Sequence, residues 1–310
     1  MQDGRVRVVV SGGTGVIGRA AVQSLLAAGH DVDVLSRSPE NTALIESLGA
    51  RACPADLFDP DSLQRIYAGA DAVVNLASRV PVGYAAVWPG SWRDHDALRT
   101  TAVANVVAAA RAAGVRRVVQ ESVSFLYADH GDAWITEQDS IEITPATEPS
   151  AVGESHVLGF GSASRAGVVL RFGSIVGDDA MTRFWLKAAA SRRPVGVGRR
   201  DQWSHLVHTD DLGSAVLAAL QAPNGVYNVG AAPVLRGELV DGYAKAVGVD
   251  SGAFLGPVLR RLAGPRVEPL TRSLRVSSDH FSAQTGWQPR RSTFDPAWFD
   301  AAQAPVAATS

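Results

Sequence analysis

The sequence predicts a doubly wound α/β fold with a parallel sheet, on three observations. Short apolar segments alternate with helical segments over the first 170 residues. The apolar segments, such as residues 6–10 and 72–76, are nearly continuous runs, as in strands buried on both faces. A glycine-rich turn directly follows the first of them. Regular alternation of this kind is typical of parallel sheets with crossover helices.

Each element follows from a local pattern. Runs rich in branched residues predict strands, and apolar residues at helical spacing that end in glycine predict helices. Strands are expected at residues 6–10, 31–35, 51–53, 72–76, 118–121, 168–171 and 226–229, with a short one at 274–276. Helices are expected at 16–26, around 44–48, and at 61–68, 94–113, 181–191, 210–220 and 238–247.

Composition limits the classes of function. The chain has 310 residues, of which 46% are hydrophobic, enough for a large core. The net charge is −2, so the chain lacks the excess of positive charge that binding to nucleic acid or to an anionic membrane requires. The single cysteine, Cys53, excludes an intramolecular disulfide and a cysteine-based zinc site. With no signal-peptide layout and no apolar run near ~20 residues, we expect a cytoplasmic protein without a membrane partner.

The turn Ser11-Gly12-Gly13-Thr14-Gly15-Val16-Ile17-Gly18 is the strongest motif. It follows a strand, opens a helix and begins a βαβ unit, which is the context of a dinucleotide-binding Rossmann turn. Gly12 permits the tight turn, Gly15 the approach of a pyrophosphate, and Gly18 the packing of helix on sheet. A purely structural glycine turn is the alternative. The residues expected to contact the cofactor here are Gly12, Thr14, Gly15, Val16, Ile17 and Gly18.

The end of the second strand indicates which cofactor binds. An acidic residue there would bond the ribose hydroxyl and favour NAD. The run is instead Val34-Leu35-Ser36-Arg37-Ser38, and Arg37 suits a 2′-phosphate. The prediction is therefore NADP, with NAD the less favoured alternative. A solvated loop arginine remains the other interpretation of Arg37.

In sequence order, the motifs resemble the extended or atypical branch of the short-chain dehydrogenase/reductase superfamily, the epimerase/dehydratase-like group. The resemblance covers nearly the whole chain. It implies adenine contacts from Asp56 and Leu57 and a cofactor contact from Ala77 in the Asn75-Leu76-Ala77 stretch. Further similar stretches are Leu170-Arg171-Phe172-Gly173, Val207-His208-Thr209-Asp210-Asp211 and Gly225-Val226-Tyr227-Asn228-Val229-Gly230.

The resemblance also implies a domain organisation. We expect a dinucleotide-binding Rossmann domain at residues 1–175, to which residues 200–229 return. Residues 176–199 and 230–300 are expected to form a smaller C-terminal substrate-binding lobe. The oligomeric state is not readable from the sequence, and a homodimer is one alternative.

The family's catalytic residues are missing. Most active members carry a serine and a Tyr-x-x-x-Lys pair, whose spacing puts phenol and ammonium on one helix face. No Tyr-x-x-x-Lys occurs in this chain, because the residues four before its lysines are Arg183 and Asp241. Local alignment on Glu154 places Ser150 at the lysine position and Ala146 at the tyrosine position.

Tyr127, Ser122 and Ser124 are the candidate catalytic residues. If Tyr127 matches the family's Val-Tyr-Gly tyrosine, Val123 takes the serine position, and Ser122 and Ser124 flank it on one common strand face. Tyr127 follows the strand's C-terminal end, where doubly wound sheets place substrate, although it can equally be a packing residue. Glu121 lies at the same C-terminal end of the strand, where it is either a general base or a group that forms hydrogen bonds with the backbone.

Two further clusters have alternative interpretations. His205, His208, Asp210 and Asp211 have the composition of a metal site, but they match a structural junction of the family, so no metal is expected. Trp88, Trp92 and Trp134 occur in segments that can cover the cleft and bind an aromatic substrate, or merely pack as a lid.

Three functions are compatible with these features. The leading one is an atypical NADP-dependent oxidoreductase that transfers hydride to or from a small carbonyl, alcohol or activated alkene, with Tyr127, Ser122 or water as proton donor. A redox-neutral cyclase, isomerase or lyase is the second, with a structural or absent cofactor. A non-catalytic dinucleotide sensor is the third.

Overall fold

A seven-stranded parallel sheet forms the centre of the molecule. The computed structural model describes residues 4–257 and 264–303. The strand order is β10-β6-β5-β4-β1-β2-β3, and all six pairings are parallel. The predicted doubly wound fold is confirmed. The strands are β1 (Arg7–Ser11), β2 (Asp31–Ser36), β3 (Arg51–Pro54), β4 (Ala72–Asn75), β5 (Arg117–Val123), β6 (Ala166–Phe172) and β10 (Gly225–Val229).

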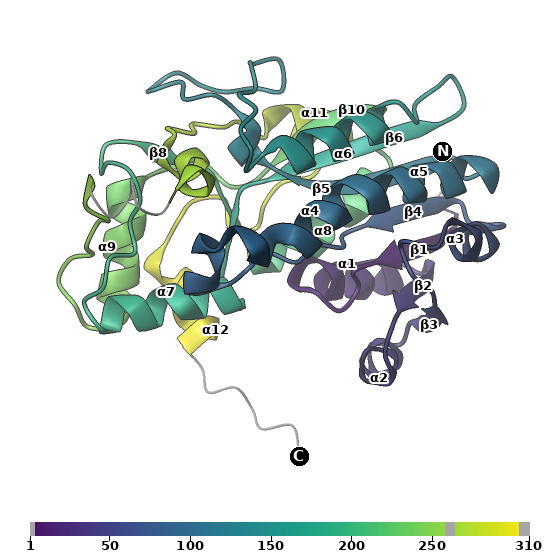
Figure 1. Cartoon of the computed structure of the whole chain (residues 1–310), viewed down its shortest axis with the longest axis horizontal. Coiled ribbons are helices and arrows are strands. Elements are labelled where there is room, and N and C mark those ends of the chain that lie inside the picture. The colour runs from purple at the N-terminus through teal and green to yellow at the C-terminus, as the bar shows by residue number, and fades with distance from the viewer. Residues whose placement is uncertain (1–3, 258–263, 304–310) are drawn as a thin grey trace.

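Helices cover both faces of the sheet (Figure 1). Because side chains alternate along a strand, Val8 and Val10 enter one core cluster and Val9 the other. The first cluster lies under α1 (Val16–Ala27), α2 (Pro39–Ser47), α8 (Leu212–Ala219) and α11 (Asp279–Thr285). The second lies under α3 (Pro60–Tyr67), α5 (Val103–Ala112) and α6 (Glu148–Leu158).

The order of the strands reverses beside β1. From β1 the chain proceeds outward through β2 and β3, then crosses back to β4 and continues through β5 and β6 to β10. The crossovers on the two sides of this point lie on opposite faces of the sheet, so a crevice opens above the carboxyl ends of β1 and β4. The fold thereby fixes where a ligand can enter.

The long helix expected at residues 94–113 contains a change of winding. It begins as α4 (Arg93–Ala97), passes through a π-helical turn, η3 (Leu98–Ala102), and continues as α5. A π-turn widens the helix locally, and such turns are frequent at functional sites. Here the turn brings Leu98 and Arg99 to the pocket described below.

A second core gathers at the other end of the molecule, away from β1–β3 (Figure 1). It packs α7 (Ala180–Ala190) and α9 (Arg236–Ala246) against η7 (Pro296–Phe299) and α12 (Asp300–Gln303). Two small sheets adjoin it, β7 (Ser174–Val176) with β9 (Leu206–His208), and β8 (Trp203–Ser204) with β11 (Val234–Leu235).

Not all of the expected lobe packs in this second core. Phe281 and Trp287 belong to the first cluster under the main sheet. Residues 274–276 do not form the expected strand, and Val276 makes only an isolated bridge to Ile135. Within the described ranges, we find no helix with the length and apolar character needed to cross a bilayer.

The glycine turn supplies a test of the fold. A Cβ on Gly18 would overlap the carbonyl oxygen of Gly12 and lie 2.6 Å from the Cα of Gly13. Because both contacts are backbone, the turn itself would have to move. We therefore expect Gly18→Ala to lower the free energy of unfolding by about 1–3 kcal/mol in urea titrations.

Gly90→Ala is the matched control, since a Cβ there meets nothing within 4 Å. Equal unfolding free energies for the two variants would show that the turn does not depend on close packing at Gly18.

Candidate functional site

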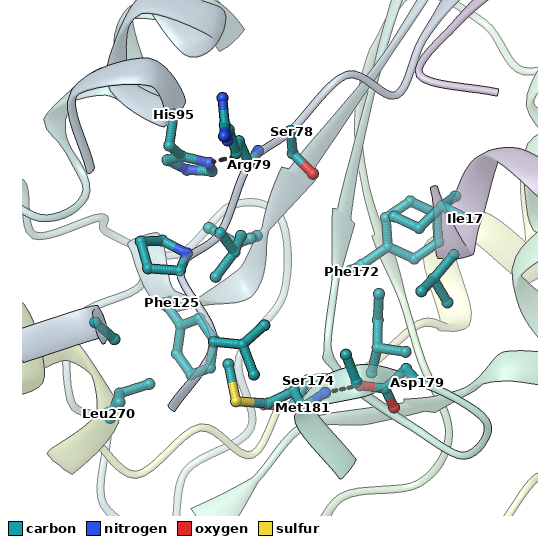
Figure 2. Close-up of a pocket in the computed structure, with 18 of the residues that line it drawn as sticks. Ile17, Ser78, Arg79, His95, Phe125, Phe172, Ser174, Asp179, Met181 and Leu270 are labelled. Atoms are coloured by element: carbon teal, nitrogen blue, oxygen red, sulfur yellow. Dashed lines mark hydrogen bonds between the residues drawn. The ribbon is translucent and has the colours of Figure 1, made fainter. Parts of the chain in front are cut away.

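The crevice opens into a large cavity of about 1230 Å³. Its walls come from the glycine turn, the carboxyl ends of β4, β5 and β6, and the second core. Figure 2 shows one part of it, with Ile17 of α1 and Phe172 of β6 on one side and Phe125 on the other. Segments distant in sequence thus share one pocket.

The glycine turn presents an open helix end to the pocket. Gly15 precedes α1 with extended backbone, and its N–H donates to the Gly12 carbonyl at 3.0 Å. The first turn of α1 has neither a side-chain cap nor an acidic residue. Its backbone N–H groups are therefore available to an anion. Gly12 has a φ of +75°, and a Cβ there would meet the Ala77 backbone nitrogen at 2.6 Å. These residues fit a pyrophosphate.

A second group of residues extends the pocket along β2 and β3. Leu35, Arg37 and Asn41 line it from β2 and α2, and Ala55 and Leu57 line it after β3. Among the described hydrogen bonds and ion pairs, none involves the Arg37 side chain, whereas the neighbouring Ser36 hydroxyl lies 2.9 Å from Thr42 Oγ1. This end of the pocket therefore combines aliphatic side chains with one amide and one guanidinium.

Eight of the ten predicted cofactor-binding residues line the pocket: Gly12, Thr14, Gly15, Val16, Ile17, Arg37, Leu57 and Ala77. Gly18 does not, because it packs beneath the turn. Asp56 does not line it either, because it is exposed and its carboxylate accepts the Phe58 N–H at 3.0 Å. Asn41 was not predicted, because the helix was expected only around residues 44–48, whereas α2 begins at Pro39.

The three positions aligned with the family's catalytic residues meet in this pocket. Val123 from β5, Ala146 before α6 and Ser150 on α6 all line it. Neither phenol nor ammonium is present at these positions. The pocket's Tyr243 belongs to the second core, and burial raises its phenol pKa. Lys187 and Lys245 do not line the pocket.

The three predicted catalytic residues lie outside the pocket. Alternation along β5 turns Val123 toward the cavity, and Ser122 the other way, where its hydroxyl donates to Glu154 Oε1 at 2.6 Å. Ser124 is also buried away from the cavity, and its hydroxyl has no partner in the described part of the chain. Ser122 in β5 and Ser124 just after it are therefore both separated from a ligand in the cavity.

Tyr127 is fully buried. Its hydroxyl donates to Asn228 Oδ1 at 2.8 Å, and the Arg171 guanidinium lies over its ring at 4.7 Å. Burial raises the pKa of Tyr127 to about 12. The packing interpretation of Tyr127 fits this placement, because Tyr127 follows η4 (Ser124–Leu126), in which Phe125 lines the cavity while Ser124 and Leu126 are buried away from it.

Arg99 and Glu121 form a buried ion pair in the pocket wall. Arg99 Nη2 donates to Glu121 Oε1 at 2.6 Å, and Nη1 donates to the Glu121 carbonyl at 2.5 Å. Burial raises the pKa of the Glu121 carboxyl, although Arg99 opposes this shift. The sequence indicated Glu121 as a group at this rim, but gave no sign of Arg99, because the π-turn that presents it has no clear sequence pattern.

His95 on α4 is a neutral hydrogen-bonding group. Its Nδ1 accepts the backbone N–H of Arg79 at 3.3 Å, which places the ring proton on Nε2 (Figure 2). Burial, together with Arg99 and Arg266, lowers the pKa of His95 to about 3. The ring therefore remains uncharged in the pocket at neutral pH.

The residues that resembled a metal cluster have separate roles. His205 lines the pocket, whereas His208 Nδ1 accepts the backbone N–H of Asp210 at 3.2 Å. No group of three or more potential metal ligands occurs in residues 4–257 and 264–303. Of the predicted cleft tryptophans, Trp92 lines the pocket, while Trp88 is 71% exposed and Trp134 packs on Arg275 away from it.

We expect His205 to make the stability of the protein depend on pH. Burial lowers its pKa to about 3, and neither ring nitrogen has a partner within the described residues. Below the ordinary histidine pKa of about 6.5, the unfolded chain binds a proton at His205 that the folded chain does not. The free energy of unfolding therefore decreases as the pH is lowered. From pH 6.5 to 5, His205 alone should contribute a loss of roughly 2 kcal/mol.

The measurement is a pair of urea titrations, at pH 7 and pH 5, on the unsubstituted protein and on His205→Leu. The variant should lose less stability on acidification by that amount. An equal loss in both proteins would mean that His205 is protonated while the protein stays folded.

Comparisons with known proteins agree with this architecture. A protein of a Streptomyces species named 3-diazoavenalumate denitrifying reductase is 29% identical, over 95% of this chain and 98% of its own. Human epimerase family protein SDR39U1, solved with NADPH, shares the fold with a TM-score of 0.76 at 22% identity, covering 96% of this chain and 100% of that one. MoeE5, solved with UDP-glucuronic acid and NAD, shares the fold with a TM-score of 0.75 at 22% identity, covering 96% of this chain and 99% of that one.

The family assignment rests on a longer match. Residues 8–230, which hold the glycine turn and all seven strands of the central sheet except the start of β1, match the NAD dependent epimerase/dehydratase family. The glycine turn lines the cavity, and so do Val123, Ala146 and Ser150, the three positions that the sequence analysis aligned with the family's catalytic residues. The chain belongs to the NAD dependent epimerase/dehydratase family.

Proposed function

We propose that this protein is an NADPH-dependent reductase that replaces the diazonium group of a small aromatic substrate with hydrogen. The observation that carries the proposal is the chemistry of the three altered positions. Val123 and Ala146 offer no proton, and Ser150 lacks the paired tyrosine and lysine of the family's relay, because no Tyr-x-x-x-Lys occurs in the sequence. Reduction of a carbonyl needs a proton for the oxygen, so a substrate that needs no proton suits this pocket better.

An arenediazonium ion meets this requirement. When bound, the dinucleotide supplies a hydride. The new C–H bond takes the hydride's electron pair, the C–N bond breaks, and its electrons leave with dinitrogen. The products are the arene and the oxidised cofactor, and the proton count balances without any acid or base from the protein. The pocket's task is then to bind, orient and exclude water.

The pocket wall supports an aromatic substrate. Phe125 and Phe172 lie on either side of the space in Figure 2, and Leu98 and Trp92 add further apolar surface. Flat apolar walls of this kind favour a planar ring. The name of the Streptomyces relative, a denitrifying reductase of a diazo compound, supports the same substrate class.

NADP is the proposed cofactor because of Arg37. Arg37 lines the pocket beside Leu35 and Asn41, at the end where the ribose of a bound dinucleotide would lie. Asp33 is the nearest carboxylate in β2, but it is buried and bonded to Arg7 and Arg51. An unneutralised guanidinium in this position favours a 2′-phosphate.

Arg37→Ala should therefore weaken NADP binding by one to two orders of magnitude while barely changing NAD binding. The expected loss corresponds to about 1.5–3 kcal/mol for a hydrogen bond to a charged group. Calorimetric titration of each cofactor gives both affinities.

Arg51→Ala is the control, since Arg51 is a nearby arginine paired with Asp33 and outside the pocket. Equal losses for both cofactors, or an initial preference for NAD, would contradict the role of Arg37.

The substrate class is tested with benzenediazonium and 4-hydroxybenzenediazonium, using NADPH deuterated at the transferable position. We expect NADPH oxidation matched by dinitrogen release, with one deuterium on the former C–N carbon. The Gly15→Val variant is the background control, because the valine side chain would occupy the space of the pyrophosphate and prevent cofactor binding. Any reduction seen with this variant occurs in solution, without the enzyme site.

The proposal fails if neither probe is reduced faster than with Gly15→Val, or if the arene carries no deuterium. If the protein instead reduces compounds from a panel of carbonyls, the result would favour a reductase that acts on carbonyl groups. Tight cofactor retention without turnover would favour the redox-neutral or sensor alternatives.

A further inference from the structure

His95 offers the cavity a hydrogen-bond donor that a ligand can reach. Its Nδ1 accepts the backbone N–H of Arg79 at 3.3 Å, so the proton of the neutral ring is on Nε2, which has no partner among the described residues. Unlike both ring nitrogens of His205, Nε2 of His95 is not one of the buried unpaired atoms of those residues, so part of its surface is accessible. His95 is 8% exposed and lines the cavity, toward which its ring projects from α4 (Figure 2).

Two contacts fix the direction of this donor. The hydrogen bond from Arg79 holds one edge of the His95 ring. Trp92 packs against the ring, with centroids 5.3 Å apart and an angle of 84° between the planes. Trp92 is itself covered by the Arg266 guanidinium, 5.0 Å from its ring centroid. A donor that is already oriented loses little freedom when a ligand binds, so its hydrogen bond contributes more to affinity.

The charges around His95 favour an anionic acceptor. Burial is the main cause of its low pKa, and Arg99 and Arg266 lower that pKa further. Both arginines are ion-paired, with Glu121 and Asp96, but the guanidiniums act more strongly on the ring than these carboxylates do. The potential at the uncharged ring is therefore positive. A hydrogen bond to an ionised acceptor is also about twice as strong as one to a neutral acceptor.

The cavity wall as a whole has an excess of positive charge. Its described lining residues include six arginines and two acidic residues: Arg37, Arg79, Arg99, Arg193, Arg236, Arg266, Glu121 and Asp179. Carboxylates neutralise three of these arginines. Among the described residues Arg236 has no such partner, and it donates to neutral oxygens such as the Val197 carbonyl at 2.9 Å. This wall disfavours a bare diazonium cation, whereas a diazonium whose ring carries an anionic group has no net charge.

We infer that the aromatic substrate carries an anionic oxygen, a carboxylate or a phenolate, which accepts a hydrogen bond from His95 Nε2–H. The inference rests on the proposed function in that it specifies the aromatic substrate more closely as an anion-bearing one. His95 binds and orients the substrate through this bond, and it transfers no proton in the reaction.

The experiment measures binding without turnover. The protein is saturated with NADP⁺, and calorimetry gives its affinities for two matched pairs of probes. Benzoate and nitrobenzene have the same shape, as do pentafluorophenolate and hexafluorobenzene, but only the first of each pair is an anion. We expect at least one anion to bind about tenfold or more tightly than its neutral partner. The pair that shows the preference distinguishes a carboxylate from a phenolate.

Two amide variants of His95 separate its donor from its structural bond. In His95→Asn the amide oxygen can replace Nδ1 as acceptor for the Arg79 N–H, but the longer reach to the position of Nε2 is lost. We expect this variant to lose the preference about tenfold or more, with NADP⁺ affinity unchanged. In His95→Gln the amide nitrogen can reach the position of Nε2, so the preference should stay within about threefold of that of the unsubstituted protein.

His30→Asn is the matched control. His30 Nδ1 also accepts a backbone N–H, from Val6 at 3.4 Å, but His30 lies outside the cavity lining, so this variant should keep the full preference. Thermal unfolding establishes that each variant is folded. Because His95 is neutral, the preference should also be constant between about pH 6 and pH 8. A steady fall of the preference with rising pH would reveal an imidazolium–anion pair and would overturn the neutral donor.

If His95→Asn does not fold, proton NMR of the unsubstituted protein with isotope-labelled histidine replaces it. The preferred anion, and not its neutral partner, should shift one histidine Nε2–H resonance to higher frequency. The inference is overturned if the protein binds both members of each pair equally, if the preference survives in His95→Asn, or if no such resonance shifts. Since no diazonium compound is present, these outcomes are independent of whether diazonium reduction is observed.

Discussion

The close contact between the glycine turn and the sheet is the constraint on which the rest of the site depends. Gly12 lies against the backbone after β4, and Gly18 lies against Gly12, so the start of α1 is held directly above the crevice between β1 and β4. This contact fixes an open helix end at the point where the strand order reverses. The other walls of the pocket, at the carboxyl ends of β4, β5 and β6 and in the second core, surround this helix end.

The pocket joins two parts of the chain that differ in chemistry. One end has the glycine turn, the uncapped start of α1 and Arg37, for which no ion pair occurs among the described residues. The other end has Val123, Ala146 and Ser150, two aliphatic side chains and one serine, at the positions that the sequence analysis aligned with the family's catalytic residues. The fold therefore fixes the place of a ligand without fixing the chemistry done there.

Buried polar groups in this protein differ in how completely they are hydrogen-bonded. Both carboxylate oxygens of Glu154 are bonded, as expected for a group that stabilises the fold. Glu121, His205 and Arg99 each have a buried atom without a partner among the described residues. Such atoms cost free energy of folding. The sequence cannot reveal the difference between the two glutamates, since each pairs with an arginine, Glu154 with Arg171 and Glu121 with Arg99.

The sequence by itself determined the features that arise locally: the alternation of strands and helices, the glycine turn, Arg37 after β2, and the loss of Tyr-x-x-x-Lys. Each depends on residue type and spacing within one or two elements. Tertiary structure decided which side chains reach the cavity. Ser122 lies in β5, and Ser124 and Tyr127 follow it, yet all three are buried outside the cavity, while a π-turn brings Arg99 to Glu121 from a distant helix. Side-chain direction depends on packing between distant segments, which spacing along one strand does not encode.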